Sequence, residues 1–379
     1  AQARALGADP SVAGVRASRS LAQPAVQARI RTPQPADEAA APGGGANVPA
    51  DDQATPGGDA PRAGQPGDLP DADADALGQA ASPDGDEEGG GAPAAPPPLL
   101  TETRPRPLAV VVDNAPQGYA RLTGLSSASW VAEMPVEGGL TRLMPMFDVS
   151  DPGQVGPVRS ARDYFVHVAE RSDAVLVHDG GSPDAMVALT SSRSPSLNAF
   201  RRGDLFSRAS DGAAPYNLFS DGSALRQAMA GLNVNPSRLL EGYRPMAAED
   251  PMEEASEVEI DWGGVYQSGF AYQPAQDRYR WLRNGQPGVQ ADGQAILVDA
   301  VLIARIDARP KPGDTEGRLY IAVDRGGPAT LLWRGTVQSG RWSVEGGLRF
   351  TNEDGTDVSL EAIRTWAAFV PNSQSVEWR

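Results

Sequence analysis

The sequence has 379 residues, no cysteine, two histidines and a formal net charge of -16. The missing cysteines exclude disulfides, cysteine-ligated metals and a cysteine nucleophile, and two histidines are too few for a histidine-rich metal site. The acidic balance argues against nonspecific nucleic-acid binding and against docking on anionic lipid. We therefore expect no nucleic-acid partner.

Membrane attachment is not visible in the sequence itself. No apolar run approaches the roughly 18 residues that a membrane span needs, so we expect no transmembrane segment. The sequence starts at Ala1 rather than at methionine. We interpret this start as processed or trimmed, so that a signal peptide, and any lipid anchor with it, would have preceded Ala1.

Residues 1–103 are of low complexity and are dominated by Gly, Pro, Ala and Asp. They carry six Arg against fifteen Asp and Glu, including the acidic run at 84–88. Such a segment buries too little apolar surface to offset the entropy that ordering costs. We predict that residues 1–103 form a disordered tether.

After residue 103 the pattern changes to alternating strands and helices. Ser160 is expected to be the N-cap of a helix that has Asp163 at its third position. Ser182 is expected to be the N-cap of the next helix, which has Pro183 as its first residue. The alternation predicts an α/β domain over residues 104–250. The predicted strands are 108–112, 140–149, 155–158 and 174–178, and the predicted helices start at 160, 182 and 223.

Residues 251–379 show strand patterns and almost no helix, apart from a weak helix pattern at 359–364. Asn284-Gly285 is a strong two-residue hairpin signal, and residues 352–355 form another predicted turn. We predict a smaller antiparallel β-rich domain that follows the α/β domain. Its predicted strands are 258–262, 269–272, 279–282, 296–306, 318–323, 330–333 and 335–342.

Several stretches resemble the YerB-like family of bacterial cell-envelope lipoproteins, built around a domain of unknown function. The most specific is 155–165 (VGPVRSARDYF). Ala132 departs from the family, which has Tyr there, and the family's lipobox cysteine is absent. The resemblance implies an extracytoplasmic location, in the cell envelope or periplasm, and no settled reaction. The other stretches are 106–114, 124–126, 136–142, 177–183, 216–218, 335–342 and 364–371.

The first candidate ligand site comprises Arg159, Ser160 and Arg162 at a predicted helix start. Free backbone N–H groups and the helix dipole favour an anion there, and two guanidinium groups supply bidentate donors. This pattern is typical of a phosphate or carboxylate site. Because Ser160 and Asp163 are expected to cap the helix, the Arg162 side chain is expected to face the ligand.

The same two arginines also allow a purely structural interpretation. Arg159 and Arg162 could pair with nearby carboxylates and hold the sheet to its loops. The sequence leaves this choice open. The candidate carboxylates are Asp113, Glu133 and Glu137.

The second candidate site comprises His178, Gly181 and Ser182, where a strand passes through Gly-Gly into a helix. This geometry resembles a phosphate cradle, but the spacing is neither that of a P-loop nor that of a dinucleotide fingerprint. A tight turn explains the glycines equally well. His178 ends a strand, where α/β domains place functional groups, yet a structural histidine would have the same position.

The third candidate group joins Thr141 and Arg142 to the carboxylates Asp113, Glu133 and Glu137. Asp113 ends a buried strand and is expected in the same crevice as Arg159. Carboxylates beside an anion site could hold Mg²⁺ or Ca²⁺, so a divalent cation stays an alternative to having no cofactor. The sequence identifies no confident metal ligand and no catalytic residue.

Two functions from different classes fit these residues. The first is a cell-envelope binding or scaffold protein, not an enzyme, with an Arg-lined anion-binding crevice for an envelope ligand or protein partner. The alternative is a phosphotransferase similar to the LytR-CpsA-Psr family, which acts on lipid-pyrophosphate-linked glycopolymers; Arg159 and Arg162 would then bind pyrophosphate and Asp113 a metal. Arginines converging on an open pocket favour the enzyme, and arginines buried in carboxylate pairs favour the binding protein.

Overall fold

The computed structural model describes residues 99–244, 253–264 and 266–379. These residues belong to one compact unit that spans Glu88–Arg379. The predicted tether therefore lies outside the described residues up to residue 98. Ordered structure begins before residue 104, because strand β1 covers Leu100–Pro105.

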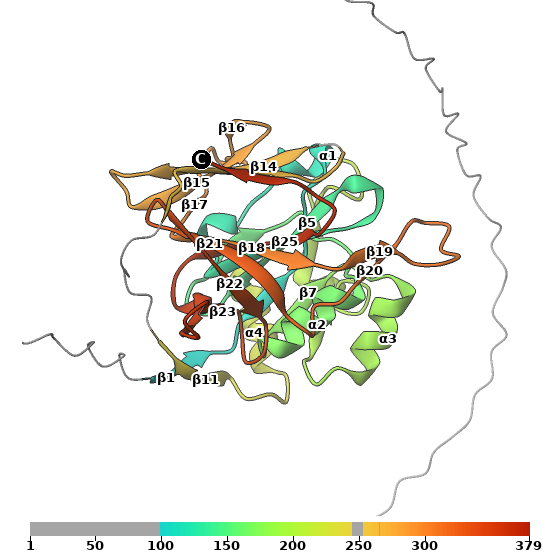
Figure 1. Cartoon of the computed structure of the whole chain (residues 1–379). Coiled ribbons are helices and arrows are strands. Elements are labelled where there is room, and N and C mark those ends of the chain that lie inside the picture. The colour runs from blue at the N-terminus through green and yellow to red at the C-terminus, as the bar shows by residue number, and fades with distance from the viewer. Residues whose placement is uncertain (1–98, 245–252, 265) are drawn as a thin grey trace, which may run out of the picture. The chain divides into compact units, whose positions relative to one another are not determined.

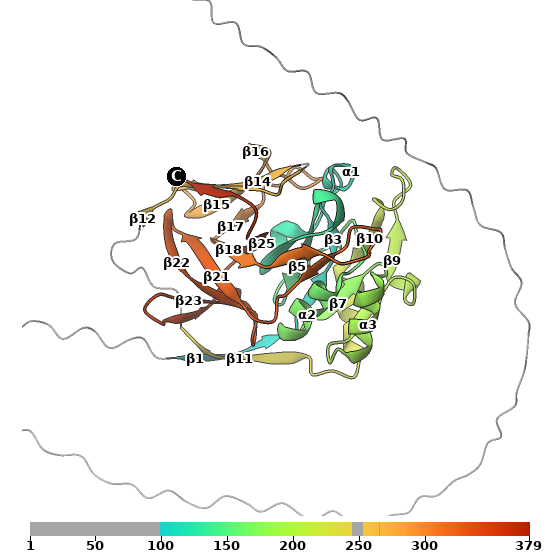
Figure 2. The same ribbon diagram turned by 45° about the vertical axis from the view of Figure 1, so that its right-hand side comes forward.

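One large sheet runs through the described unit, and Figures 1 and 2 show it between the helices and a smaller sheet. Strand β12 (Glu253–Glu254) pairs with β22, and β3 (Val112–Asp113) pairs with β5. The path of the sheet is β24 (Asp357–Ser359), β23 (Arg349–Asn352), β22 (Thr336–Ser343), β21 (Gly327–Trp333), β18 (Ala300–Ile306), β25 (Thr365–Pro371), β4 (Trp130–Pro135), β5 (Thr141–Phe147), β2 (Leu108–Val110), β7 (Val175–His178) and β8 (Ser196–Asn198).

The centre of this sheet joins the two halves of the chain. Strand β25 pairs in parallel with β4 on one side and with β18 on the other. Strands β2, β7 and β8 are also parallel, as expected for the α/β part, whereas β18 to β24 are joined by antiparallel pairs. The boundary predicted at 250/251 lies outside the described residues, and strands from both sides of it share the sheet.

The remaining strands form smaller sheets. A six-stranded antiparallel sheet comprises β16 (Gln286–Pro287), β15 (Arg278–Arg283), β14 (Gln267–Gln273), β13 (Glu257–Asp261), β26 (Val376–Trp378) and β17 (Leu297–Val298). The others pair β1 with β11 (Ser237–Tyr243), β10 (Leu218–Asp221) with β6 (Gln154–Val155) and β9 (Phe206–Arg208), and β19 (Ala308–Pro310) with β20 (Leu319–Ile321).

The α-helices of the described residues are short, and all of them lie before residue 231. Figures 1 and 2 show α2 and α3 on one side of the large sheet and β14 to β17 on the other. The α-helices are α1 (Pro116–Tyr119), α2 (Asp163–Arg171), α3 (Pro183–Ser191) and α4 (Gly222–Ala230). Single 3-10 turns cover Leu125–Ser127, Glu137–Gly139, Gly203–Leu205 and Leu360–Ala362. No helix of the described residues is long and apolar enough to span a membrane.

Each face of the large sheet is buried against a different layer, as the alternation along β4 shows. Trp130, Ala132 and Met134 pack in one core with Phe165 of α2. Val131 packs on the opposite face, in the core that contains Trp366 and the aromatic residues of the six-stranded sheet. Glu133 lies two residues after Val131, on the same face of the strand, and so points toward that second core, where it is fully buried.

The predicted fold class is confirmed: a mixed α/β part is followed by a β-rich part. The hairpins at Asn284-Gly285 and at 352–355 are present. The predicted helix cap at Ser182 is also confirmed, because the Ser182 hydroxyl accepts from the N–H of Ala185 at 3.2 Å. The helix pattern at 359–364 yields only the 3-10 turn. Strand β4 had no counterpart among the predicted strands.

The predicted cap at Ser160 is wrong. Helix α2 begins at Asp163, its N-cap position is Arg162, and no side chain caps it. The reason lies in the preceding residue: Ala161 is extended and forms a parallel bridge with Gly181, donating to the carbonyl of Gly180 at 3.0 Å. Ser160 therefore lies too far upstream to cap the helix.

Candidate functional site

Residues 157–161 run between the carboxyl ends of two strands of the large sheet. The N–H of Arg159 donates to the carbonyl of Val111 at 2.8 Å, and the N–H of Asp179 donates to the carbonyl of Arg159 at 3.0 Å. The segment thus bridges Val111, which directly follows β2, and Asp179, which directly follows β7. This is the edge at which parallel strands of α/β folds present functional groups, and it gathers most of the predicted site residues.

Arg159 forms an ion pair with Asp113 at this edge. The Asp113 side chain is only 3% exposed and also accepts from the N–H of Ala115 at 2.6 Å. The guanidinium of Arg159 lies 5.2 Å from the ring centroid of Tyr216. Burial lowers the pKa of Arg159, although Tyr216 opposes the shift. The predicted proximity of Asp113 and Arg159 is thus observed, with the two charges paired.

Arg162 clasps Glu137 through two hydrogen bonds, both of 2.6 Å. Both side chains are mostly buried. Burial opposes ionisation of Glu137, but the hydrogen bonds and charge of Arg162 prevail and lower the pKa of Glu137. Glu137 lies at the tip of the β4–β5 hairpin, before Gly138 and Gly139, which have φ of 73° and 69°. The Arg162 side chain therefore faces a carboxylate of its own chain.

Arg142 lies beside this pair and has no carboxylate of its own. Arg142 is 8% exposed, and its guanidinium donates to the backbone carbonyl of Ser160. Among the described residues, no carboxylate lies within ion-pair distance of it. Burial, and then the charge of Arg162, lower the pKa of Arg142 to about 10. Glu137 therefore pairs with Arg162, and it acts on Arg142 only through its charge at longer range.

The Gly-Gly group is close to these residues in the fold but is occupied by structural contacts. Ser182 uses its hydroxyl to cap α3, and Gly181 forms the bridge with Ala161. His178 is fully buried, its Nδ1 lies 2.7 Å from the carbonyl oxygen of Gly180, and burial lowers its pKa. Gly180 has φ of 66°, a conformation that favours glycine.

Glu133 and Thr141 lie on the other face of the sheet, in a buried polar cluster. Thr141 donates to Glu133 Oε1 at 2.9 Å, while Ser268 Oγ and Trp366 Nε1 each donate to Oε2 at 3.0 Å. Asn114 also donates to Oε1, at 3.2 Å. Burial raises the pKa of Glu133 to about 7, although these hydrogen bonds oppose the shift. Glu133 therefore does not belong to the arginine edge.

The cluster contains residues from the second half of the chain that the sequence did not single out. Tyr266 contacts Asn114 and Thr141 through its hydroxyl. Arg283 donates to the side-chain and backbone oxygens of Asn114 at 2.7 and 3.0 Å. Arg283 directly precedes Asn284-Gly285, but no local pattern connects it to Asn114. The cluster as a whole joins the two halves.

The two groups of residues differ in what they can do chemically. At the arginine edge, three guanidinium groups meet the carboxylates of Asp113 and Glu137, and the charge of Asp179 also acts on Arg159. Asp113 and Glu137 are both engaged by arginine, and the described residues contain no group of three His, Cys, Asp or Glu side chains that could hold a metal ion. The geometry suits an anion and offers no metal centre in this part of the chain.

Comparison with protein families yields two matches. Residues 97–235 match the N-terminal domain of a family of proteins of unknown function, DUF3048. Residues 258–367 match the C-terminal domain of the same family.

Comparison with individual proteins points in the same direction. The chain is 28% identical over 279 residues to the "Putative lipoprotein YerB" of Bacillus subtilis (strain 168), which spans 71% of this chain and 82% of that protein. The crystal structure of YerB protein from Bacillus subtilis superposes with a TM-score of 0.63 and covers 72% of this chain and 94% of the solved chain.

Proposed function

Because the chain belongs to the DUF3048 family of YerB-like proteins, we propose that it is a cell-envelope binding protein whose ligand is an anion held by Arg142 and Arg162. Burial lowers the pKa of Arg159, and Arg159 lies close enough to Arg162 for the charge of Arg162 to add to this shift. The relative from Bacillus subtilis is named as a lipoprotein, which supports placing this chain outside the cytoplasm. The family itself brings no reaction with it.

The proposal rests on Arg142, which is buried, donates to the Ser160 carbonyl, and has no carboxylate within ion-pair distance in the part of the chain that the structure describes. A buried guanidinium without a carboxylate partner costs free energy unless another negative charge reaches it. Two further features favour an anion here: α2 starts beside Arg162 without a side-chain cap, and its dipole is positive at that end. Carboxylate and phosphate both match guanidinium geometry.

Glu137 acts in this proposal as an internal anion that the ligand replaces. Its carboxylate occupies the donors of Arg162 in the free protein, and it lies in a hairpin tip where two following glycines ease a change of backbone conformation. A phosphate or carboxylate that displaced it would bind Arg162 and gain Arg142 as well. The ligand would therefore contact two guanidinium groups, whereas Glu137 pairs with only one.

The carboxylate pairs favour a binding protein over a phosphotransferase. Arg159 and Arg162 are both engaged by carboxylates instead of lining an open pocket. Asp113, the metal ligand expected for the phosphotransferase, is already held by Arg159 and by the N–H of Ala115. Neither ion pair provides a nucleophile or a group that could contact a leaving group.

A thermal-shift titration with inorganic phosphate tests the proposal, with sodium chloride at equal ionic strength as the reference. We expect phosphate to raise the melting temperature of the wild type, because a ligand that binds only the folded state stabilises it. Arg142→Gln should lose this response. Glu137→Gln should melt at a lower temperature without phosphate but respond more strongly to it, since the competing carboxylate is gone.

Arg341→Gln is the matched control, because Arg341 is exposed on β22 and is remote from the site in the sheet order. It should keep the full phosphate response. An equal response in Arg142→Gln and the wild type would show a general salt effect and contradict the proposal. If Arg142→Gln fails to fold, an unchanged phosphate response in Glu137→Gln would contradict it on its own.

A further inference from the structure

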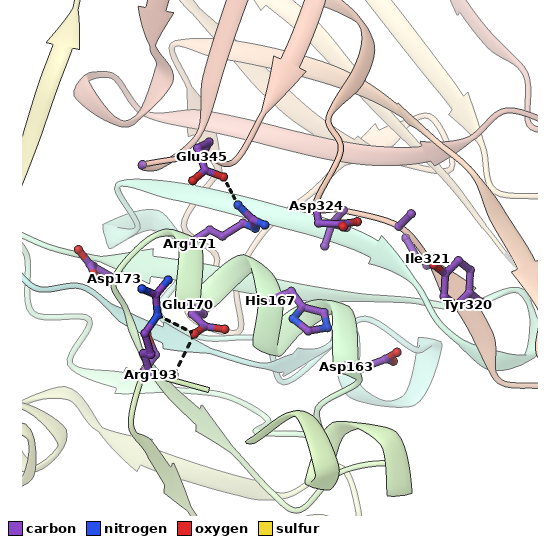
Figure 3. A pocket seen from close by; sticks show the side chains of 14 residues that line it. Asp163, His167, Glu170, Arg171, Asp173, Arg193, Tyr320, Ile321, Asp324 and Glu345 are labelled. Atoms are coloured by element: carbon purple, nitrogen blue, oxygen red, sulfur yellow. Dashed lines mark hydrogen bonds and ion pairs between the residues drawn. The ribbon is translucent and has the colours of Figure 1, made fainter. Parts of the chain in front are cut away.

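The hairpin formed by β19 and β20 packs against the first half of the chain at the start of α2. Figure 3 shows Asp163 at the start of α2 together with Tyr320 and Ile321 of β20, and all three residues line one cavity. Ile321 is buried in the same core as the apolar residues of α2. A hairpin from the second half of the chain therefore adjoins the helix that has Arg162 of the proposed anion site as its N-cap residue.

Lys311 directly follows β19 and is the only lysine of the chain. Its ammonium forms ion pairs with Asp163, the first residue of α2, at 3.2 Å and with Asp184, the second residue of α3, at 2.5 Å. Burial opposes its positive charge, but the hydrogen bonds and charges of the two aspartates prevail and raise the pKa of Lys311. A compact ammonium suits this position, because its three donors can reach carboxylates on two helices, whereas a planar guanidinium matches one carboxylate.

Without Lys311, the two aspartates would place negative charge where the anion is expected. Asp163 directly follows Arg162 in the chain, and its side chain is only 19% exposed, so solvent screens its charge incompletely. Like charges repel more strongly in such a partly buried place than they do in water. An Asp163 carboxylate without its cation would therefore oppose an anion bound to Arg162.

Arg318 connects the same hairpin to the arginine edge at a second point. The pKa of Arg318 is raised mainly by its hydrogen bond with Asp314, and the charge of Glu137 contributes to the shift. Arg318 thus lies within electrostatic reach of the carboxylate that pairs with Arg162. The hairpin brings two cations to this edge, Lys311 at Asp163 and Arg318 near Glu137.

We infer that Lys311 is a positioning residue of the anion site, which neutralises Asp163 and Asp184 so that the starts of α2 and α3 remain positive toward the ligand. The inference rests on the proposed anion site and adds to it a residue from the second half of the chain. Lys311 acts through the two aspartates and does not contact the ligand. The affinity for an anion should therefore follow the net charge of these three side chains and not the presence of the ion pair as such.

Charge variants test the inference through the phosphate affinity, measured by the thermal-shift titration described above. Lys311→Met should weaken phosphate binding about tenfold, because it leaves two carboxylates without their cation beside the ligand. Adding Asp163→Asn should restore most of the affinity, since the group then has its wild-type net charge although the ion pair is still missing. Asp163→Asn alone should bind phosphate more tightly than the wild type.

Arg341→Met is the matched control, because it removes a positive charge at an exposed position of β22, and it should bind phosphate like the wild type. If the wild type responds to phosphate, an equal affinity of Lys311→Met, or equal weakening in the single and double variants, would overturn the inference and leave the anion site standing. A wild type without any phosphate response would contradict the anion site and this inference together. If Lys311→Met fails to fold, an affinity of Asp163→Asn no higher than that of the wild type would overturn the inference on its own.

Discussion

Glu133 of β4 accepts a hydrogen bond from the indole N–H of Trp366 in β25 at 3.0 Å, and so joins two strands that come from opposite halves of the chain. The two residues are 233 positions apart in the sequence. Trp366 also stacks on Trp281 of the six-stranded sheet, with ring centroids 5.0 Å apart. The polar contact is therefore set inside an aromatic core, where water cannot replace a lost partner.

The buried position of Glu133 predicts a pH-dependent stability. The carboxyl ionises near its ordinary pKa of 4.5 in the unfolded chain and at about 7 in the folded one. Between these values the folded state keeps a proton that the unfolded state has lost, so the free energy of unfolding falls as pH rises from about 4.5 to 7. The loss totals about 3 kcal/mol. Urea denaturation between pH 5 and pH 8 measures it.

Glu133→Gln should remove this part of the pH dependence, because an amide does not titrate. The absolute stability of the variant can differ, since Ser268 and Trp366 are donors and the new amide nitrogen cannot accept from them. The slope against pH is thus the relevant quantity. Glu259→Gln, at an exposed position of β13, is the control and should retain the wild-type slope. Parallel pH profiles for Glu133→Gln and the wild type would refute the assignment.

Arg159→Met should be strongly destabilising, because it leaves the buried carboxylate of Asp113 without its cation. The expected cost is on the order of 3 kcal/mol. For a folded region of this size the melting temperature should fall by roughly 6 to 12 °C. Differential scanning calorimetry measures the change.

Adding Asp113→Asn to Arg159→Met should recover much of the loss, since the stranded charge is gone. Arg341→Met, at an exposed arginine, should change the melting temperature little. A drop of the same size in the double and single variants would show that the packing of Arg159, and not its charge, matters.

Gly180→Ala should be destabilising without affecting anion binding. A Cβ at this position would clash with the ring of Phe200, and φ of 66° is unfavourable for alanine. Phe200 is exposed and can move, so backbone strain of about 1 kcal/mol should dominate. Urea denaturation gives the loss, and the phosphate thermal shift should stay at its wild-type size. A lost phosphate response would instead indicate that the Gly-Gly turn binds the ligand.

Local patterns in the sequence predict much of the fold. Apolar alternation and turn residues indicate most strands of the second half, and Ser182 with Pro183 marks the start of α3. Strand β4 escapes prediction because it is buried on both faces and because Glu133 and Pro135 interrupt its apolar run. Its place beside β25 depends on pairing across the whole chain, which no local pattern encodes.

The sequence predicts which residues form the candidate site, but it does not predict which arginine pairs with which carboxylate. The motif around Arg159 and Arg162 and the carboxylates Asp113 and Glu137 are all found at one edge of the sheet. Which carboxylate each arginine binds depends on the register of β5 and on where α2 begins. For the same reason Arg142 has no carboxylate within ion-pair distance among the described residues, and only the three-dimensional structure shows this.

A crystal structure determined with saturating phosphate tests the central claim most directly. We expect a phosphate within hydrogen-bond distance of the guanidinium groups of Arg142 and Arg162, with the Glu137 carboxylate displaced toward solvent. A structure in which Glu137 still pairs with Arg162, and in which no phosphate lies within hydrogen-bond distance of Arg142, would contradict the proposed anion site.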